Sequence, residues 1–252
     1  MHGGTTGKKG AAARSLVMLA PAPDAFTGES ERHLCSTDTA EALGARVNRD
    51  VVGAFRQLKH DAQLAGFDLR ILSGFRSFGA QLSIWNRKAT GRLAVLDHEA
   101  RPIDIATLTH VELVFAILRW SALPGASRHH WGTDVDVFDE AARPEDYEVD
   151  LIPAEVNEGG MFGPLHGWLD ARIAAGTASG FFRPYDRDRG GVAPERWHLS
   201  HAPSAAGFER LISAGLLRAA IEHADMALRE TVLEHLDGIV DRFVLNTNRP
   251  TP

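Results

Sequence analysis

Residues 127–136 read Ser-Arg-His-His-Trp-Gly-Thr-Asp-Val-Asp, and residues 195–198 read Glu-Arg-Trp-His. Together these stretches contain the imidazoles and the carboxylate that hold zinc in catalytic sites, where a fourth position stays open for water. Glu195 stands three residues before His198 and can accept a proton from that water without binding the metal itself. The two stretches therefore predict a catalytic zinc site with nitrogen and oxygen ligands.

The same stretches predict the local structure that would carry such a site. His129 and Asp136 are seven residues apart, which is too far for neighbouring positions on one helical face. Gly132 between them permits a sharp turn, and residues 135–138 are typical of a buried strand. A loop followed by a strand can therefore direct His129 and Asp136 to one point, while His198 lies in a second short extended run.

The pattern Ser-x-His-x-x-Gly-x-x-x-Asp followed by Glu-x-Trp-His resembles the signature of the VanY-type D-alanyl-D-alanine carboxypeptidases. These enzymes belong to the wider superfamily that includes lysostaphin-type endopeptidases. Upstream, residues 72–77 read Leu-Ser-Gly-Phe-Arg-Ser, with Gln81 following, and are similar to the Ser-Gly-Tyr-Arg-Ser segment of that family. The resemblance runs from roughly residue 45 to residue 202.

The resemblance implies roles for the residues of the site. It makes His129, Asp136 and His198 the zinc ligands and Glu195 the catalytic base. It makes Arg76 the arginine that faces the substrate carbonyl, or the oxyanion formed from that carbonyl.

Three further residues are assigned to substrate binding: Ser127, Gln81 and Trp197. Ser127 matches the motif serine that helps to hold the substrate, and Trp197 is also suited to form a wall by packing. The chain departs from the pattern at Asp134, where the family usually has alanine. An extra carboxylate so close to the ligands bears on the ligand assignment and can alter the substrate charge that the site prefers.

The other histidines and the cysteine narrow the choice of ligands. Most of the twelve histidines are expected to be surface or core residues. His130 and His201 lie one and three positions from a proposed ligand, so each stays an alternative ligand. Cys35 is the single cysteine, which excludes an internal disulfide and a thiolate zinc finger.

Composition narrows the classes of protein and of partner. The chain has 252 residues, of which 44% are hydrophobic and 24% charged, as in a globular protein with a sizeable core. A net charge of −6 and the lack of a long basic run argue against nucleic acid or an anionic membrane surface as a partner. No stretch approaches the roughly 18–20 apolar residues of a membrane span.

The patterning along the chain predicts an α+β fold, in which a small antiparallel sheet carries the zinc site and helices flank it. Helices are expected over about residues 39–65, 78–89, 105–122 and 165–173, with a strand over residues 68–73. Two amphipathic helices are expected beyond residue 202. Three regions follow: a flexible N-terminal segment (1–36), a zinc metallopeptidase domain (37–202) and a C-terminal helical extension (203–252).

The predicted function is that of a zinc-dependent carboxypeptidase that hydrolyses the C-terminal bond of peptidoglycan-type peptides, with D-Ala-D-Ala as the model substrate. The reaction type follows from the site, whereas the D-amino-acid preference follows only from the resemblance. Two alternatives stay open: a cell-wall endopeptidase of the same superfamily, and a non-enzymatic zinc-binding recognition module. The substrate favours the cell envelope or periplasm, although the apolar run at residues 16–20 is too short for a signal peptide.

Overall fold

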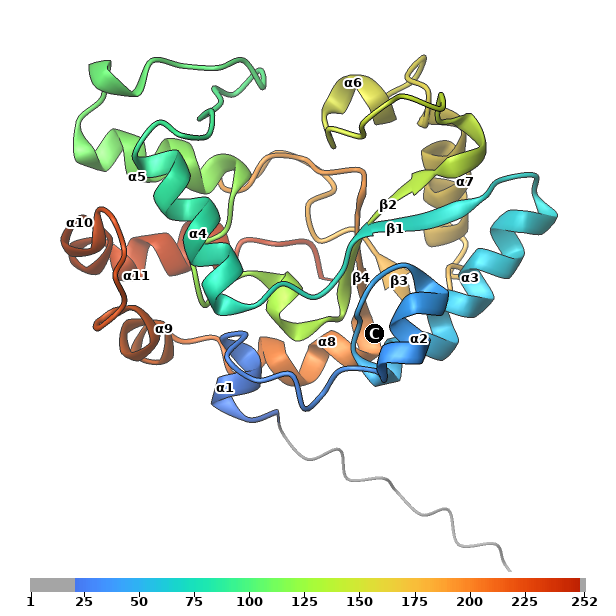
Figure 1. Ribbon diagram of the computed structural model, residues 1–252, viewed down its shortest axis with the longest axis horizontal. Coiled ribbons are helices and arrows are strands. Elements are labelled where there is room, and N and C mark those ends of the chain that lie inside the picture. The colour runs from blue at the N-terminus through green and yellow to red at the C-terminus, as the bar shows by residue number, and fades with distance from the viewer. Residues whose placement is uncertain (1–20, 250–252) are drawn as a thin grey trace, which may run out of the picture.

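A four-stranded antiparallel sheet lies at the centre of the computed structural model, which describes residues 21–249 (Figure 1). In spatial order the strands are β1 (Leu69–Ser73), β2 (Asp134–Asp139), β4 (His198–His201) and β3 (Phe181–Phe182). Helices lie on both sides of the sheet, and further helices follow β4. The predicted α+β fold with a small antiparallel sheet is confirmed.

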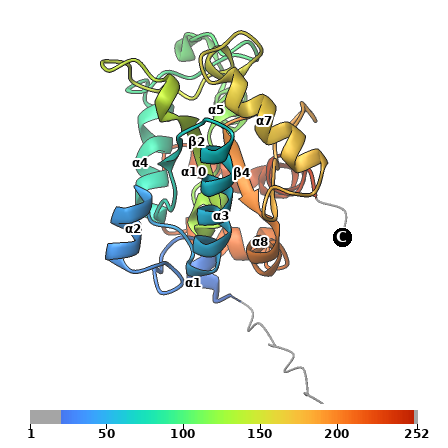
Figure 2. The same cartoon turned by 90° about the vertical axis from the view of Figure 1, so that its right-hand side faces the viewer.

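One face of the sheet is apolar because side chains alternate along each strand. Val135, Val137 and Leu199 point into a core that they share with α2 (Thr37–Leu43), α3 (Val52–Leu64) and α7 (Gly163–Ala174). Figure 2 shows α3 in front of the strands. The alternate positions carry polar side chains and lie on the opposite face: Asp134, Asp136, His198 and Ser200.

A second core joins two helices from the middle of the chain to the C-terminal helices. The helices are α4 (Phe78–Ala89), α5 (His110–Trp120), α8 (Ala202–Glu209), α9 (Ala214–Ile221), α10 (Arg229–Glu234) and α11 (Leu236–Ile239). Trp85 of α4 is fully buried there, and its Nε1 donates to the carbonyl of Ala227 at 2.9 Å. The next residue, Asn86, donates to the carbonyl of Asp225 and accepts from the amide of Ala227. The turn before α10 therefore holds one face of α4.

Short helical turns complete the structure. They are α1 (Pro23–Phe26), α6 (Pro153–Val156), the 3-10 turns Arg49–Val51, Ile105–Thr107, Arg128–Trp131 and Glu140–Ala142, and a π-helical turn at Val240–Val244. Within residues 21–249, no helix has both the length and the apolar character that crossing a membrane requires.

The predicted flexible N-terminal segment is only partly within the described residues. Residues 1–20, with the apolar run at 16–20, lie outside them. Phe26 of α1 is fully buried, and its ring lies 5.6 Å from that of Trp131. This later part of the segment therefore packs on the folded core.

The predicted helix over residues 39–65 is wrong, because two helices occupy this range. α2 ends at Gly44, whose φ of +82° is the left-handed conformation that favours glycine at a helix C-terminus. Helical structure begins again after Asn48, whose side chain accepts from the amide of Asp50 and caps the 3-10 turn Arg49–Val51. The apolar residues Val47 and Val51 fit a helical spacing, but they reach the core from separate segments.

Two other helix predictions also need correction. The helix predicted over 105–122 begins only at His110, because Thr109 and Glu112 form a capping box that fixes its first turn. The two helices predicted after residue 202 are four helices and a π-helical turn. Breaks occur where Ser213 caps α9 and where Leu228, with φ of +62°, precedes α10.

Candidate active site

Asp136 and His198 lie opposite each other on adjacent strands. β2 and β4 are antiparallel, and their register pairs Asp136 with His198 and Asp134 with Ser200. Residues paired in this way present their side chains on the same face, with Cβ atoms about 4.5–5.5 Å apart. The sheet therefore brings a carboxylate and an imidazole together from distant parts of the sequence.

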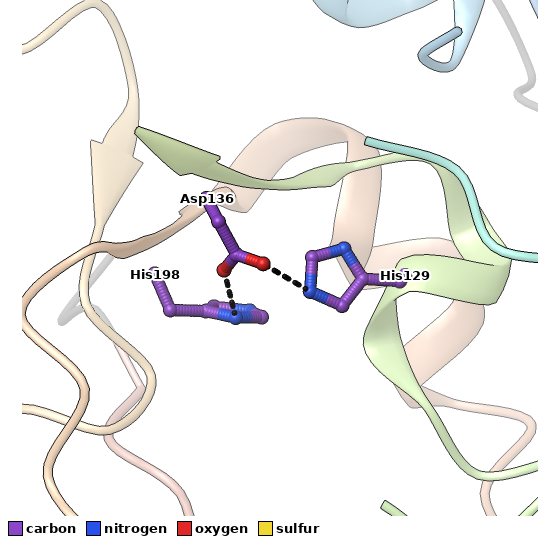
Figure 3. Close-up of side chains that lie close together, drawn as sticks. All are labelled: His129, Asp136 and His198. Atoms are coloured by element: carbon purple, nitrogen blue, oxygen red, sulfur yellow. Dashed lines mark ion pairs between the residues drawn. The ribbon is translucent and has the colours of Figure 1, made fainter. Parts of the chain in front are cut away.

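His129 reaches the same point from the 3-10 turn before β2. That turn ends at Gly132, whose φ is +64°. A Cβ atom at Gly132 would lie 2.7 Å from the amide nitrogen of Asn48, so both the conformation and the close approach require glycine. The turn directs His129 Nε2 to within 3.2 Å of Asp136 Oδ2 (Figure 3). The predicted arrangement of a turn followed by a strand is present.

Hydrogen bonds on the far sides of the two imidazoles decide which nitrogens face Asp136. His129 Nδ1 lies 2.9 Å from the carbonyl oxygen of Gly74, which can only accept, so this nitrogen carries the proton. His198 Nε2 donates in the same way to Asp134 Oδ1 at 3.0 Å. The unprotonated nitrogens then face Asp136, with His198 Nδ1 lying 3.1 Å from its Oδ1. Lone pairs from three side chains therefore converge.

Three lone pairs that lie so close together repel one another unless a positive charge lies between them. The three ligand atoms lie within 4.8 Å of one another, and all three residues are buried. Without a metal, Asp134 and Asp136 outweigh the burial that opposes a charge on His198 and raise its pKa to about 10, so a second proton, on Nδ1, supplies this charge. A metal ion supplies the same charge, and two imidazoles with one carboxylate are a typical ligand set for catalytic zinc. His129, Asp136 and His198 thus form a candidate metal site that fits zinc.

The two alternative histidines do not belong to this group. His130 Nδ1 lies 2.6 Å from the carbonyl oxygen of Arg76, and its Nε2 accepts from the amide of Gly125 at 3.0 Å. His201 Nδ1 lies 2.8 Å from Ser204 Oγ. Both nitrogens of His130 are therefore engaged elsewhere, and His201 is held in a contact with α8.

Glu195 lies beside the candidate metal site without joining it. Its Oε2 is 3.6 Å from His198 Nδ1, and its amide donates to the carbonyl of Tyr185 at 2.9 Å. Burial raises the pKa of Glu195 to about 7, although the neighbouring His198 opposes this shift. A carboxyl group that titrates near neutral pH can both accept and release a proton. The structure therefore brings the predicted base to the predicted ligands.

Arg76 follows β1 and is fixed by its neighbours. Its amide donates to the carbonyl of His129 at 3.1 Å, and its guanidinium donates to Ser73 Oγ at 3.1 Å and to Gln81 Oε1 at 3.0 Å. Gln81 is fully buried and donates in turn to the carbonyl of Ala122 at 2.8 Å. Gln81 therefore holds Arg76 from behind and is not among the residues that line the adjacent cavity.

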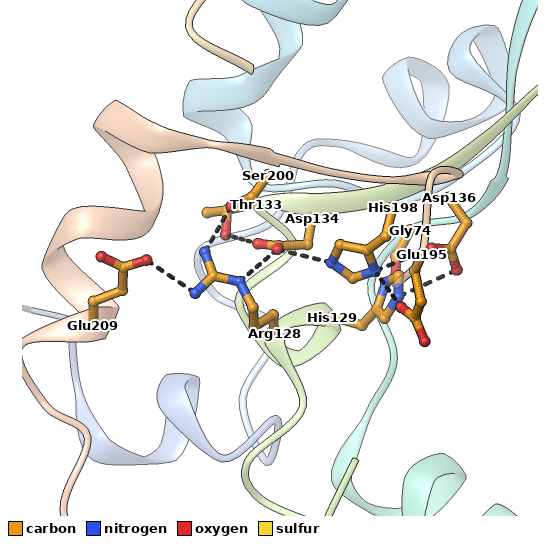
Figure 4. Close-up of polar contacts among 10 residues, drawn as sticks. All are labelled: Gly74, Arg128, His129, Thr133, Asp134, Asp136, Glu195, His198, Ser200 and Glu209. Carbon is orange, nitrogen blue, oxygen red and sulfur yellow. Dashed lines mark hydrogen bonds and ion pairs between the residues drawn. The ribbon is translucent and has the colours of Figure 1, made fainter. Parts of the chain in front are cut away.

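The site opens into a cavity of about 300 Å³. Ser127 and Trp197, which were predicted to contact substrate, both line it together with Arg76 and Glu195. Asp134 does not line it, because this carboxylate lies on the other side of the His198 ring (Figure 4). The residue that departs from the family pattern is thus separated from any substrate in the cavity.

Lys88 and Tyr185 are among the cavity residues that were not predicted from the sequence. Lys88 lies two turns after Gln81 on α4 and lines the cavity together with Ile84. The spacing of these three positions places them on one helical face and offered a signal for Lys88. Tyr185 also lines the cavity, with its ring 5.1 Å from that of His198. No pattern in the sequence indicates Tyr185.

The chain is similar to several known proteins. An uncharacterized protein of Haemophilus influenzae (strain ATCC 51907 / DSM 11121 / KW20 / Rd) is 37% identical over 101 residues, which cover 40% of this chain and 69% of that protein. A mutant of the vancomycin resistance D,D-pentapeptidase VanY, in complex with Zn(II), has a TM-score of 0.48 and 20% identity, covering 80% of this chain and 90% of that one. VanYB in complex with D-alanine-D-alanine also has a TM-score of 0.48, with 19% identity over 81% and 90% of the two chains.

The match to a protein family is broader. The sequence pattern of VanY, described as D-alanyl-D-alanine carboxypeptidase, matches residues 44–204. This range is more than half of the chain, and it includes both stretches that build the candidate metal site together with the Arg76 segment. The chain therefore belongs to the VanY family of D-alanyl-D-alanine carboxypeptidases.

Proposed function

We propose that this protein is a zinc-dependent carboxypeptidase that removes the C-terminal residue of peptidoglycan-type peptides, such as those ending in D-Ala-D-Ala. The observation that carries the proposal is the cavity, which is lined by a candidate metal site, the buried carboxyl group of Glu195 and the cations Arg76 and Lys88, with Arg128 also in the lining. Membership of the VanY family supports the reaction class, and the preference for D-Ala-D-Ala rests on that membership alone.

His129, Asp136 and His198 are the proposed zinc ligands, through Nε2, a carboxylate oxygen and Nδ1. A bound zinc ion would polarise the scissile carbonyl and lower the pKa of the attacking water. The chain contributes the alignment of the ligands, because Gly74 and Asp134 accept from the far nitrogens and fix both tautomers.

Glu195 is the proposed carrier of the proton. As water attacks the carbonyl carbon, Glu195 accepts the proton that the water loses. As the carbon–nitrogen bond breaks, Glu195 returns this proton to the leaving amine. A pKa of about 7 suits both steps, since the carboxyl group can exist in either protonation state near neutral pH.

Arg76 is the proposed partner of the oxyanion. Its guanidinium is positioned by Ser73 and Gln81, and within residues 21–249 it forms no ion pair with a carboxylate. Its charge is therefore available to an oxygen that becomes negative during the reaction, and a donor already in place needs no reorganisation.

Lys88 is the proposed partner of the free carboxylate of the substrate. It lines the cavity with Arg76 and Glu195, and burial lowers the pKa of its ammonium group. Among the described residues, Lys88 forms no ion pair within 4.0 Å, and the charge of Glu195 offsets only part of the effect of burial. A partly buried charge without a partner is unfavourable, and a ligand that brings an anion relieves this cost. Ser127 lines the same cavity and can donate its hydroxyl to that anion.

The test compares one muropeptide stem with a free and with an amidated C-terminus. Wild-type protein is expected to hydrolyse the free peptide much faster, because amidation removes the anion that Lys88 binds. Lys88→Met is expected to raise KM for the free peptide by about 10- to 100-fold, the worth of a hydrogen bond to a charged group. The same substitution should change KM for the amidated peptide little. Lys59→Met is the control, since Lys59 lies on α3 next to Asp68 and outside the cavity.

The outcomes separate the three candidate functions. Equal rates on both peptides would replace the carboxypeptidase with an endopeptidase of the same superfamily. Binding of zinc and of the peptide without hydrolysis of either form would point to a recognition module. If Lys88→Met still hydrolyses the free peptide much faster than the amidated one, another residue, such as Ser127, binds the substrate carboxylate.

A further inference from the structure

We propose that Asp134 is a positioning residue of the metal site, which holds the His198 ring so that Nδ1 faces the metal. The proposal rests on the metal site of the proposed function, but not on peptidase activity.

The carboxylate of Asp134 is held in one orientation by three donors. Its Oδ1 accepts from His198 Nε2 at 3.0 Å and from Arg128 Nε at 2.7 Å. Its Oδ2 accepts from Thr133 Oγ1 at 2.6 Å. The Asp134 side chain is completely buried, so no water competes for these contacts. Rotation of the carboxylate away from His198 would break at least two buried hydrogen bonds.

Arg128 is itself fixed on every side (Figure 4). Its guanidinium donates to Asp134, to Ser200 Oγ at 2.7 Å and to Glu209 Oε1 at 2.9 Å. It also lies 4.6 Å from the centre of the Trp131 ring, a favourable cation–π distance. A buried charge is stable only when it is paired and hydrogen-bonded, and Arg128 meets this condition. A continuous chain of contacts therefore runs from Glu209 on α8 through Arg128 and Asp134 to the proposed ligand His198.

The two ligating histidines are thus aligned by different groups. His129 donates to the main-chain carbonyl of Gly74, a contact that no side chain supplies. His198 donates to the side chain of Asp134. A carboxylate behind a ligating imidazole fixes the tautomer and raises the basicity of the ligand nitrogen. The alignment of His198 can therefore be removed by one substitution that leaves every ligand in place.

The test is an equilibrium titration of the full chain with zinc, in competition with a chromophoric chelator. Asp134→Ala is expected to weaken zinc affinity by about 10- to 100-fold, as loss of such a partner usually does. Asp134→Asn keeps an oxygen that can accept from His198, so its loss should be smaller. Glu209→Ala is the matched control, because it removes the other carboxylate on Arg128 without contacting His198. Its zinc affinity is expected to stay within about 3-fold of wild type.

A double variant separates positioning from charge balance. Asp134→Ala also leaves Arg128 buried with one carboxylate fewer, and this alone can distort the structure. Arg128→Met combined with Asp134→Ala removes both charges. If Asp134 positions His198, the double variant binds zinc as weakly as Asp134→Ala does. If Asp134 only balances Arg128, the double variant regains the wild-type affinity.

Wild-type zinc affinity in Asp134→Ala, or its recovery in the double variant, would overturn the proposal. If Asp134→Ala does not fold, as thermal unfolding would show, the double variant decides, because it removes the same acceptor without leaving Arg128 unpaired. The measurement is zinc binding, so a protein without peptidase activity would refute the proposed function and leave this result intact.

Discussion

The two sides of the His198 ring differ in how their charges are balanced. On the Nε2 side, Asp134 and Arg128 are buried and each contacts a partner of opposite charge. On the Nδ1 side, Arg76 and Lys88 line a cavity and pair with no carboxylate among residues 21–249. The first side is balanced within the protein, whereas the second leaves charges to be balanced by a ligand. The His198 ring thus lies between a structural network and a binding site, and Arg128 of that network also reaches the lining of the cavity.

Two acidic residues illustrate this difference. Burial by itself raises the pKa of both Asp134 and Glu195. Arg128 and His198 outweigh burial at Asp134 and hold the pKa of its carboxyl well below the usual range. At Glu195 burial prevails, and the pKa rises to about 7. The same chemical group is therefore a fixed anion on one side of His198 and a proton carrier on the other.

The largest expected effect follows from removing the ring that separates the two sides. His198→Ala should abolish zinc binding, because two ligands remain and Asp134 loses its contact with the site. Metal content of the purified protein and zinc titration measure this effect. Full zinc occupancy in this variant would contradict the ligand assignment, and His201 would then be the first alternative to test.

Glu195→Ala tests the cavity side alone. Turnover is expected to fall by about 10²- to 10⁴-fold, the usual contribution of a positioned acid–base group. Zinc binding should stay close to that of wild type, because Glu195 is not a ligand. Steady-state kinetics together with zinc titration separate the two effects. Near-native kcat would show that another group in the cavity accepts the proton.

Arg76→Lys tests whether the unpaired guanidinium acts on the transition state. Replacement of the fixed fork of donors by a point charge is expected to lower kcat by about 10²-fold, as for loss of one oxyanion donor. KM should rise less than kcat falls. Arg46→Lys is the control, since Arg46 pairs with Glu31 in an exposed position. An effect on KM alone would assign Arg76 to substrate binding.

The smallest expected effect concerns a buried polar side chain that, unlike Asp134, has no hydrogen-bond partner within residues 21–249. His166 on α7 is fully buried, and neither ring nitrogen has a hydrogen-bond partner among the described residues. Burial lowers the pKa of His166 to about 2 from 6.5. Below pH 6.5, His166 therefore binds a proton in the unfolded chain but not in the folded chain. The free energy of unfolding falls as pH falls. At pH 5, His166 alone should lower the free energy of unfolding by about 2 kcal/mol.

Denaturant unfolding between pH 7 and pH 5 measures this effect. His166→Leu is expected to flatten the pH dependence of the unfolding free energy over this range. His60→Leu is the control, since His60 is exposed on α3. An unchanged slope in His166→Leu would show that another group causes the loss at acid pH.

Each of the two stretches that form the candidate metal site was predictable, because the residues within one stretch are local in sequence. A glycine-containing turn followed by an alternating strand fixes where His129 and Asp136 point, and this needs no knowledge of distant contacts. The position of Glu195 beside His198 follows from three residues of separation in the same way. The domain boundaries at residues 36 and 202 stay predictions.

Other features depended on contacts that spacing does not reveal. The role proposed for Asp134 depends on which side of His198 it occupies, and this is set by the pairing of Asp134 with Ser200 across two strands. The break after α2 depends on the left-handed conformation of Gly44, which an apolar pattern with helical spacing does not show. Tyr185 enters the cavity from a loop without any periodic pattern.

Helix α4 connects the cavity to the far end of the chain. Gln81 and Lys88 of this helix lie at the candidate active site, and its residues Trp85 and Asn86 are hydrogen-bonded to the turn at residues 225–227. A protease cut in that turn would weaken these contacts of the helix while leaving every residue of the cavity intact. A complete family match over residues 44–204 is therefore not enough to guarantee a working site, because residues outside this range also hold helix α4 in place.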